Sequence, residues 1–147
     1  MKITQVSTHI LDIPFEYGGP PSGWGPSAWR ALSTLLVKVE TDAGITGWGE
    51  AFSYSCAEAV QAAVEKMVAP SVIGMDASDI AGINRHLQRS LHLFGRYGIT
   101  TFAISGLDIA LWDIAGKAAN KPLHVLLGGA GRSEIPAYAS LFRYGNP

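Results

Sequence analysis

Alternating hydrophobic and polar positions in residues 2–51 predict a small antiparallel sheet. The first stretch is rich in β-branched residues and stops at Pro14, which has no amide hydrogen for a strand ladder. In the second, residues 32–41, every other position between Leu35 and Val39 is apolar and belongs to one face. The turn DAG at residues 42–44 then leads into ITGWGEA, a pattern typical of a hairpin. We therefore expect a three-stranded meander whose apolar face is covered by other elements.

Segments with helical periodicity follow and supply that cover. The sequence SCAE at residues 55–58 has the spacing of a capping box, and an apolar stripe continues from it to a predicted end near Pro70. A second helix is predicted to begin at residues 76–79, where acidic side chains favour the positive end of the helix dipole. Its apolar side continues to Gly95 and Gly98. Both segments are amphipathic, as expected of helices that lie on a sheet.

The last predicted helix differs from the other two. Residues 101–119 carry apolar side chains around nearly the whole circumference, which predicts burial on two sides, and Asn120 with Pro122 is expected to end the helix. The glycines of residues 128–131 then break the chain, and residues 134–141 have the composition of a new strand. Because a strand needs partners, we expect these partners in a second domain that the sequence does not contain.

Composition and charge narrow the possible partners. The chain has 147 residues, too few for a complete (β/α)8 barrel of about 250 residues. Its net charge of −1 provides no basic face for nucleic acid or for an anionic membrane. Charged residues make up 16%, against about 25% in an average domain, which predicts a surface that contacts either a partner or a missing part of the chain. Cys56 is the only cysteine, and neither a leader nor a membrane span is recognisable, so a cytoplasmic protein without an internal disulfide is expected.

The polar residues give few signs of catalysis. No two histidines have the i,i+4 spacing of a metal-binding helix face, and no serine lies in a G-x-S-x-G motif. The glycines of residues 128–131 lack the third glycine of a dinucleotide-binding loop and are interpreted as a turn. Asp108 and Asp113 point about 140° apart on one helix and cannot share a metal; an ion pair with Lys117 explains the second. Glu50, at a strand end, is expected to form a structural hydrogen bond.

The aromatic residues of two loops are the better functional candidates. Residues 15–30 hold four glycines and three prolines together with large aromatic side chains, a composition typical of a functional loop. Further aromatic residues follow the predicted hairpin, again without helical or strand periodicity. These side chains either cover a ligand or fill the local core, and both interpretations stay open. The predicted substrate-binding residues are Tyr17, Trp24, Trp29, Phe52 and Tyr54.

Three stretches, taken together, resemble a known family. GITGWGEA at residues 44–51 is followed by AISGLDIALWDIAGK at residues 103–117 and by KPLHVLLGG at residues 121–129. This series resembles the N-terminal signature of the enolase superfamily, and most closely that of its mandelate racemase / muconate lactonizing enzyme group. The resemblance covers nearly the whole chain.

The resemblance implies an architecture. Residues 1–125 are expected to form an α+β capping domain, a three-stranded antiparallel meander followed by a helical bundle. Residues 126–147 are expected to form a linker and the first strand of a (β/α)7β barrel, the rest of which is absent. Two loops of the capping domain close the active site in this family. They correspond to residues 15–30 and 51–55, which are the aromatic loops identified above.

The resemblance also implies a chemistry. Such enzymes remove the proton α to a carboxylate with a Lys or His base, while Mg²⁺ stabilises the enediolate. The base and the metal ligands belong to later barrel strands, so no catalytic residue and no metal ligand is assigned to this sequence. A full-length homo-oligomeric enzyme is expected to bind Mg²⁺ and a small carboxylate that is an acid sugar, mandelate-like or muconate-like. Racemisation, cycloisomerisation and dehydration all remain possible reactions.

Two functions therefore stay open for the chain itself. It is either the capping domain of such an enzyme, inactive alone, or a stand-alone non-catalytic module for binding or dimerisation. The low charge and the apolar third helix are compatible with both.

Overall fold

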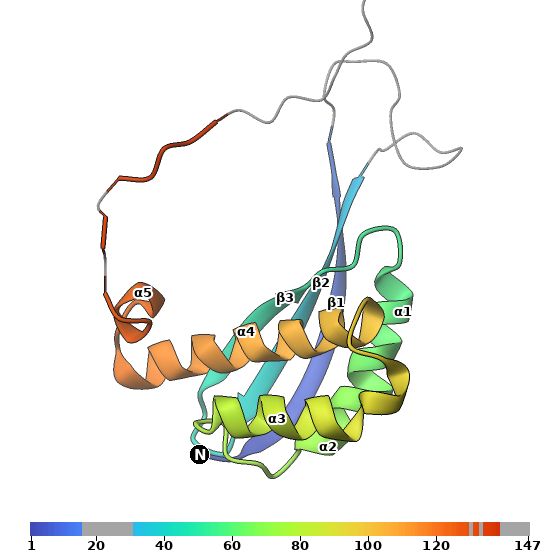
Figure 1. The fold of residues 1–147 in the computed structure, drawn as a ribbon, viewed down its shortest axis with the longest axis horizontal. Helices are drawn as coiled ribbons and strands as arrows, with labels where there is room; N and C mark the ends of the chain where they lie inside the picture. The colour runs from blue at the N-terminus through green and yellow to red at the C-terminus, as the bar shows by residue number, and fades with distance from the viewer. Residues whose placement is uncertain (16–30, 130, 133, 139–147) are drawn as a thin grey trace, which may run out of the picture.

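A three-stranded antiparallel sheet with helices on one face forms the described part of the protein (Figure 1). The computed structural model describes residues 1–15, 31–129, 131–132 and 134–138. The strands are β1 (Ile3–Pro14), β2 (Ala31–Thr41) and β3 (Thr46–Ala51). The helical elements are α1 (Ala57–Ala63), the π-helical η1 (Val64–Val68), α2 (Ala69–Val72), α3 (Ile80–Ser90), the 3₁₀ turn η2 (His92–Phe94), α4 (Ile99–Ala119) and α5 (Leu123–Leu126). The predicted α+β meander followed by helices is confirmed.

The sheet has the order β1-β2-β3, and β2 lies in the centre. Leu35, Val37 and Val39 of β2 are fully buried under the helices, as the alternation predicted. The turn between β2 and β3 contains Gly44 at φ +74°, a backbone conformation that glycine adopts without a steric cost. None of the described helices lies on the opposite face of the sheet (Figure 1).

Glycines allow α4 to lie unusually close to β3. A Cβ atom on Gly47 would lie 2.1 Å from the carbonyl oxygen of Ala110, and one on Gly49 would lie 2.2 Å from that of Gly106. A Cβ on Gly106 would in turn meet the side chain of Ala51 at 2.7 Å. The glycines of the two sequence stretches that carry the family resemblance therefore meet each other in space, strand against helix.

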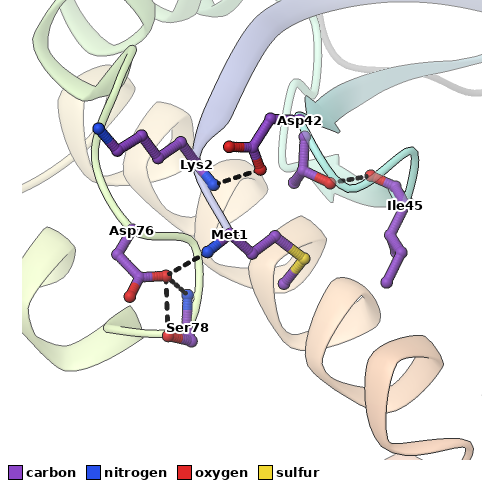
Figure 2. Close-up of polar contacts among 7 residues, drawn as sticks. Met1, Lys2, Asp42, Ile45, Asp76 and Ser78 are labelled. Carbon is purple, nitrogen blue, oxygen red and sulfur yellow. Dashed lines mark hydrogen bonds and ion pairs between the residues drawn. The ribbon is translucent and has the colours of Figure 1, made fainter.

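The N-terminus is held between the hairpin turn and the loop after α2 (Figure 2). The backbone N–H of Lys2 donates to Asp42 at 2.8 Å, and the Met1 ammonium lies 3.5 Å from the carboxylate of Asp76. The pKa of Asp76 lies below its ordinary value, chiefly because the backbone N–H of Ser78 donates to this carboxylate. The Ser78 hydroxyl also donates to it, and the Met1 charge adds a smaller effect.

The start of the first helix differs from the prediction. Cys56, not Ser55, is the N-cap residue, and no side chain caps this end. Ser55 has φ +54° and lies one residue outside the cap, so its spacing to Glu58 is not that of a capping box. Helical structure also continues beyond Pro70 to Val72, since a π turn precedes the proline and leaves it in the first turn of α2.

The second predicted helix is shorter than expected, although its start is correct. Asp79 is the N-cap of α3, and its carboxylate accepts a hydrogen bond from the backbone N–H of Gly82 at 2.9 Å. The helix ends at Ser90 and gives way to η2, so it does not continue to Gly95 or Gly98. Both glycines have positive φ, which ends the helical path before α4 begins.

Within the described residues, the third helix buries one of its two predicted sides. One side of α4 packs on the sheet and on α3, but on the other side Ile99 is 40% and Ile109 44% exposed. By length and composition α4 could cross a membrane; its close packing against Gly47 and Gly49 instead makes it the central helix of the fold. Asn120 ends the helix in the left-handed conformation, as predicted.

The C-terminal region differs from the prediction in two ways. Residues 123–126 form the short helix α5, which the sequence analysis did not predict. Residues 134–138 of the predicted strand form no strand, and residues 139–141 lie outside the described residues. Ile135 is 84% exposed and Tyr138 88% exposed. A strand needs hydrogen-bonding partners, and the described part of the chain offers none to this segment.

Candidate substrate-facing surface

The loop between β3 and α1 lies at the end of the sheet where β1 ends and β2 begins. Ala51, the last residue of β3, pairs with Leu35 of β2. The β1–β2 pair continues beyond this point to Pro14 and Ala31. The residues after Ala51 therefore lie on the side of the sheet toward which β1 and β2 extend (Figure 1). Antiparallel pairing thus places the loop after Ala51 at the end of the sheet where β1 ends and β2 begins.

Phe52 and Tyr54 form an aromatic cluster with the start of α4. The rings of Phe52 and Phe102 meet edge to face with centroids 4.8 Å apart, and Phe52 stacks on Tyr54 at 6.3 Å. Phe52 nevertheless stays 57% exposed. One part of the ring is held by its neighbours and the rest is free for another surface, an arrangement suited to contacting a ligand or a second domain. Sequence reasoning missed Phe102 because it belongs to the apolar pattern of its helix.

The backbone of this loop is tightly turned. Cys56 donates its N–H to the carbonyl oxygen of Ser53 at 3.0 Å, and Ser55 adopts a left-handed conformation. Ser53 is only 3% exposed, and its hydroxyl has no hydrogen-bond partner among the described residues. The turn places Ser53 inward between two aromatic neighbours, which leaves the ring of Phe52 on the surface.

Three of the predicted substrate-binding residues, Tyr17, Trp24 and Trp29, lie outside the described residues. Phe52 and Tyr54 are brought together as described. No group of three or more His, Cys, Asp or Glu side chains that could hold a metal ion occurs in residues 1–15, 31–129, 131–132 and 134–138.

The ion pair predicted between Asp113 and Lys117 exists and has a further role. The Lys117 ammonium lies 2.6 Å from Asp113 Oδ2. The backbone N–H of Trp48 donates to the same carboxylate at 2.8 Å, and Lys117 donates to the carbonyl oxygen of Thr46 at 2.8 Å. Two backbone groups at the free edge of β3 are thus satisfied by side chains of α4. Asp108 accepts a hydrogen bond from Asn84 at 3.2 Å, which is also a structural role.

An apolar surface runs along the exposed side of α4. It comprises Ile99, Phe102, Ile109 and Trp112, and it begins beside the aromatic loop because Phe102 contacts Phe52. Near the other end of the helix it borders an open hollow of about 640 Å³ lined by Trp48, Trp112 and Leu123, among others. Exposed apolar side chains along one side of a helix are typical of a contact with another part of a protein.

Comparison with known proteins decides the family. Residues 27–128 match the family described as "Mandelate racemase / muconate lactonizing enzyme, N-terminal domain". The chain belongs to this family. The expected resemblance to the mandelate racemase / muconate lactonizing enzyme group, and to its N-terminal capping domain, is thereby confirmed.

Relatives in this family include enzymes of acid-sugar metabolism. The chain is 39% identical over 140 residues to D-galactonate dehydratase of Pectobacterium atrosepticum, covering 95% of the chain and 31% of the relative. It is 36% identical over 144 residues to D-galactarolactone cycloisomerase of Agrobacterium fabrum, covering 95% and 35%. A crystal structure of an enolase superfamily member from Polaromonas sp. JS666 has 40% identity and a TM-score of 0.82, covering 95% and 36%. The chain thus spans about a third of the length of these relatives.

Proposed function

We propose that this chain is the capping domain of an enzyme that removes the α-proton of an acid-sugar carboxylate. The observation that carries this proposal is the similarity over nearly the whole chain to a sugar-acid dehydratase and to a cycloisomerase. Residues 1–125 form the cap in this proposal, and residues 126–147 lead into the catalytic barrel. The product is either a dehydrated acid sugar or a rearranged lactone, and the parent enzyme is cytoplasmic and homo-oligomeric.

The capping domain acts by excluding water and shaping the substrate site. In this proposal, Phe52 and Tyr54 face the bound acid sugar, together with Tyr17, Trp24 and Trp29. A closed aromatic cover lowers the local dielectric constant, which strengthens the electrostatic interactions that stabilise the enediolate. The half-exposed ring of Phe52, held by Phe102 and Tyr54, supports this role because it is positioned without being buried.

The proton-abstracting base and the Mg²⁺ ligands belong to the barrel in this proposal. Mg²⁺, when bound there, stabilises the negative charge of the enediolate. The described residues of this chain contribute packing, orientation and water exclusion only. The chain alone is accordingly proposed to be inactive, in contrast to a stand-alone binding module.

The test uses the protein at its natural length and a panel of aldonic and aldaric acids and their lactones with Mg²⁺. We expect turnover of at least one acid sugar. We expect Phe52→Ala to change the ratio of kcat/KM between two substrates at least tenfold, because the ring shapes the site rather than supplying the chemistry. Ile73→Ala, at a residue of similar exposure remote from the loop, serves as the control.

Two results contradict this proposal. The first is the absence of turnover with every member of the panel, which favours the non-catalytic module. The second is a Phe52→Ala variant that lowers kcat/KM equally for all substrates, or that unfolds at a markedly lower temperature than the Ile73→Ala control.

A further inference from the structure

One row of residues on α4 lies along β3. The residues of this row are spaced four positions apart and therefore share one face of the helix: Phe102, Gly106, Ala110 and Ile114. Gly47 of β3 packs against Ala110 and Ile114. Gly49, two residues further along the strand, packs against Gly106, which lies one helical turn earlier. The strand thus passes along the row in the direction of Phe102.

Phe102 lies where the strand ends and the aromatic loop begins. A Cβ atom on Gly106 would meet the side chain of Ala51, the last residue of β3, at 2.7 Å. The next residue, Phe52, contacts Phe102, with ring centroids 4.8 Å apart and an angle of 64° between the rings. The small residues of the row let the strand approach α4, and the large ring at its end contacts the first side chain of the loop.

The two rings of this pair differ in how firmly they are held. Phe102 is half-buried, packs against the hydrophobic core and donates its backbone N–H to the carbonyl oxygen of Gly98 at 2.9 Å, within the first turn of α4. Phe52 is 57% exposed. An edge-to-face pair stabilises one relative orientation of its rings beyond the burial of area. Phe102 is therefore the anchored partner, and Phe52 is the ring that it orients.

The loop conformation that presents Phe52 carries two unfavourable features. Ser55 adopts a left-handed conformation at φ +54°, which costs free energy in a residue with a side chain. The hydroxyl of Ser53 is buried and has no hydrogen-bond partner in the part of the chain that the structure describes. A buried polar group without a partner is also unfavourable. Favourable ring contacts must offset these costs, and the contact of Phe52 with Phe102 is one of them.

We propose that Phe102 is a positioning residue of the substrate site. It sets the orientation of the Phe52 ring, and through that ring the choice between acid sugars, without touching the substrate itself. This inference rests on the proposed function, in which Phe52 faces the bound acid sugar. A small displacement of a group that shapes a site changes the rates of competing substrates unequally, because each substrate fits the displaced group differently.

The test uses variants of the protein at its natural length. Phe102→Leu keeps an apolar side chain but removes the ring, and Phe102→Met is a second ring-free variant with a more adaptable side chain. Phe102→Tyr keeps the ring and is the conservative variant. Ile80→Ala also shortens a half-buried side chain that packs against the core, but it lies on α3 and serves as the matched control. Thermal unfolding of each variant separates an effect on the loop from a loss of overall stability.

The first measurement is amide hydrogen exchange of residues 52–56 in the protein without substrate, followed by mass spectrometry. We expect the ring-free variants to exchange about fivefold faster in this loop, because the ring contact opposes its local opening. We expect Phe102→Tyr and Ile80→Ala to leave the exchange of the loop unchanged. This measurement requires no turnover.

The second measurement is the ratio of kcat/KM between two acid sugars. We expect Phe102→Leu to change this ratio about fivefold, with a larger effect on KM than on kcat, and Phe102→Tyr to restore it. In a protein that already carries Phe52→Ala, we expect Phe102→Leu to have no further effect on the ratio, because the ring through which it acts is gone.

Three results would overturn the inference: unchanged loop exchange in the ring-free variants, a substrate ratio to which the changes at Phe52 and Phe102 contribute independently, or equal effects in the Ile80→Ala control. An active enzyme with these results retains the proposed function and loses the role of Phe102. Absence of turnover with every acid sugar contradicts the proposed function instead, and the exchange measurement then decides by itself whether Phe102 positions Phe52.

Discussion

At the scale of single residues, glycines determine how closely a strand and a helix of this domain can pack. Gly49 and Gly106 belong to the stretches that carry the family resemblance, yet their role in the structure is to let a strand and a helix approach each other. Glycine is required there for space and not for backbone freedom, since neither residue has a positive φ. Gly44 shows the opposite case, with φ +74° and open space around it.

Gly49→Ala is therefore expected to destabilise the domain by about 3 kcal/mol, because its methyl group would overlap backbone atoms that cannot move independently of α4. Gly44→Ala is expected to cost about 1 kcal/mol, from backbone strain alone. Urea unfolding of both variants measures the difference. An equal loss of unfolding free energy in the two variants would show that the close approach of β3 and α4 does not make Gly49 more important for stability than Gly44.

Asp76 provides a pH-dependent contact at the N-terminus. Its pKa is below the ordinary value because Ser78 and Met1 favour the carboxylate. A group of this kind stabilises the folded state above its unfolded-state pKa of about 3.9 and loses that effect as the pH falls through the lower folded-state pKa. We expect Ser78→Ala, which removes the hydroxyl but keeps the backbone N–H, to move the pKa of Asp76 partly back. A carboxyl titration by NMR measures this, and an unchanged pKa in the variant contradicts it.

At the scale of elements, the contact between α4 and β3 organises the fold. The strand is an edge of the sheet, and the Asp113–Lys117 pair occupies its free N–H at Trp48 and its free carbonyl at Thr46. An ordinary surface ion pair contributes little to stability. This pair differs because it also makes charge-assisted hydrogen bonds to two backbone groups at the strand edge.

Asp113→Ala is expected to cost about 2 kcal/mol, since it leaves the edge N–H of Trp48 without its charged acceptor. Asp113→Asn keeps an acceptor oxygen and is expected to cost less. Glu40→Gln, which breaks the surface pair with Lys38, is the control and is expected to cost below about 0.5 kcal/mol. Thermal unfolding measures all three variants. Similar melting temperatures for Asp113→Ala and Glu40→Gln would mean that the pair acts only as a surface ion pair.

At the scale of the whole molecule, many large apolar side chains of the described residues lie outside the core and stay exposed. Trp112 is half-buried and borders the hollow beside α4, whereas its neighbour Leu111 is only 1% exposed. In the proposed parent enzyme the exposed side of α4 is covered by the barrel. The contribution of Trp112 to the free energy of unfolding is therefore expected to be larger when the barrel is present than in the 147-residue chain.

Trp112→Ala is expected to cost about 1–2 kcal/mol in the 147-residue chain and about 3–5 kcal/mol in the protein at its natural length. Leu111→Ala, in the core of the described domain, is expected to cost about the same, roughly 3 kcal/mol, in both. Denaturant unfolding of the two forms provides the comparison. A cost for Trp112→Ala that does not change with chain length would indicate that nothing covers this side of the helix.

The sequence by itself determined the elements whose pattern is local. Alternation predicted the buried positions of β2. The acidic residues in the range 76–79 predicted the start of α3, and Asn120 with Pro122 predicted the end of α4. The pairing of Asp113 with Lys117 followed from their spacing of four residues. Local spacing is sufficient here because each of these features depends on neighbours within one turn or one strand.

Only the tertiary structure decided which side of α4 stays uncovered, why Gly49 is needed and how the edge of β3 is satisfied. Each of these depends on residues far apart in the chain, such as Trp48 and Asp113, which are separated by 65 positions. The same holds for the contact of Phe52 with Phe102, which periodicity assigned to separate elements. The sequence pattern shows which face of an element is apolar. Which other element packs against that face depends on the tertiary arrangement.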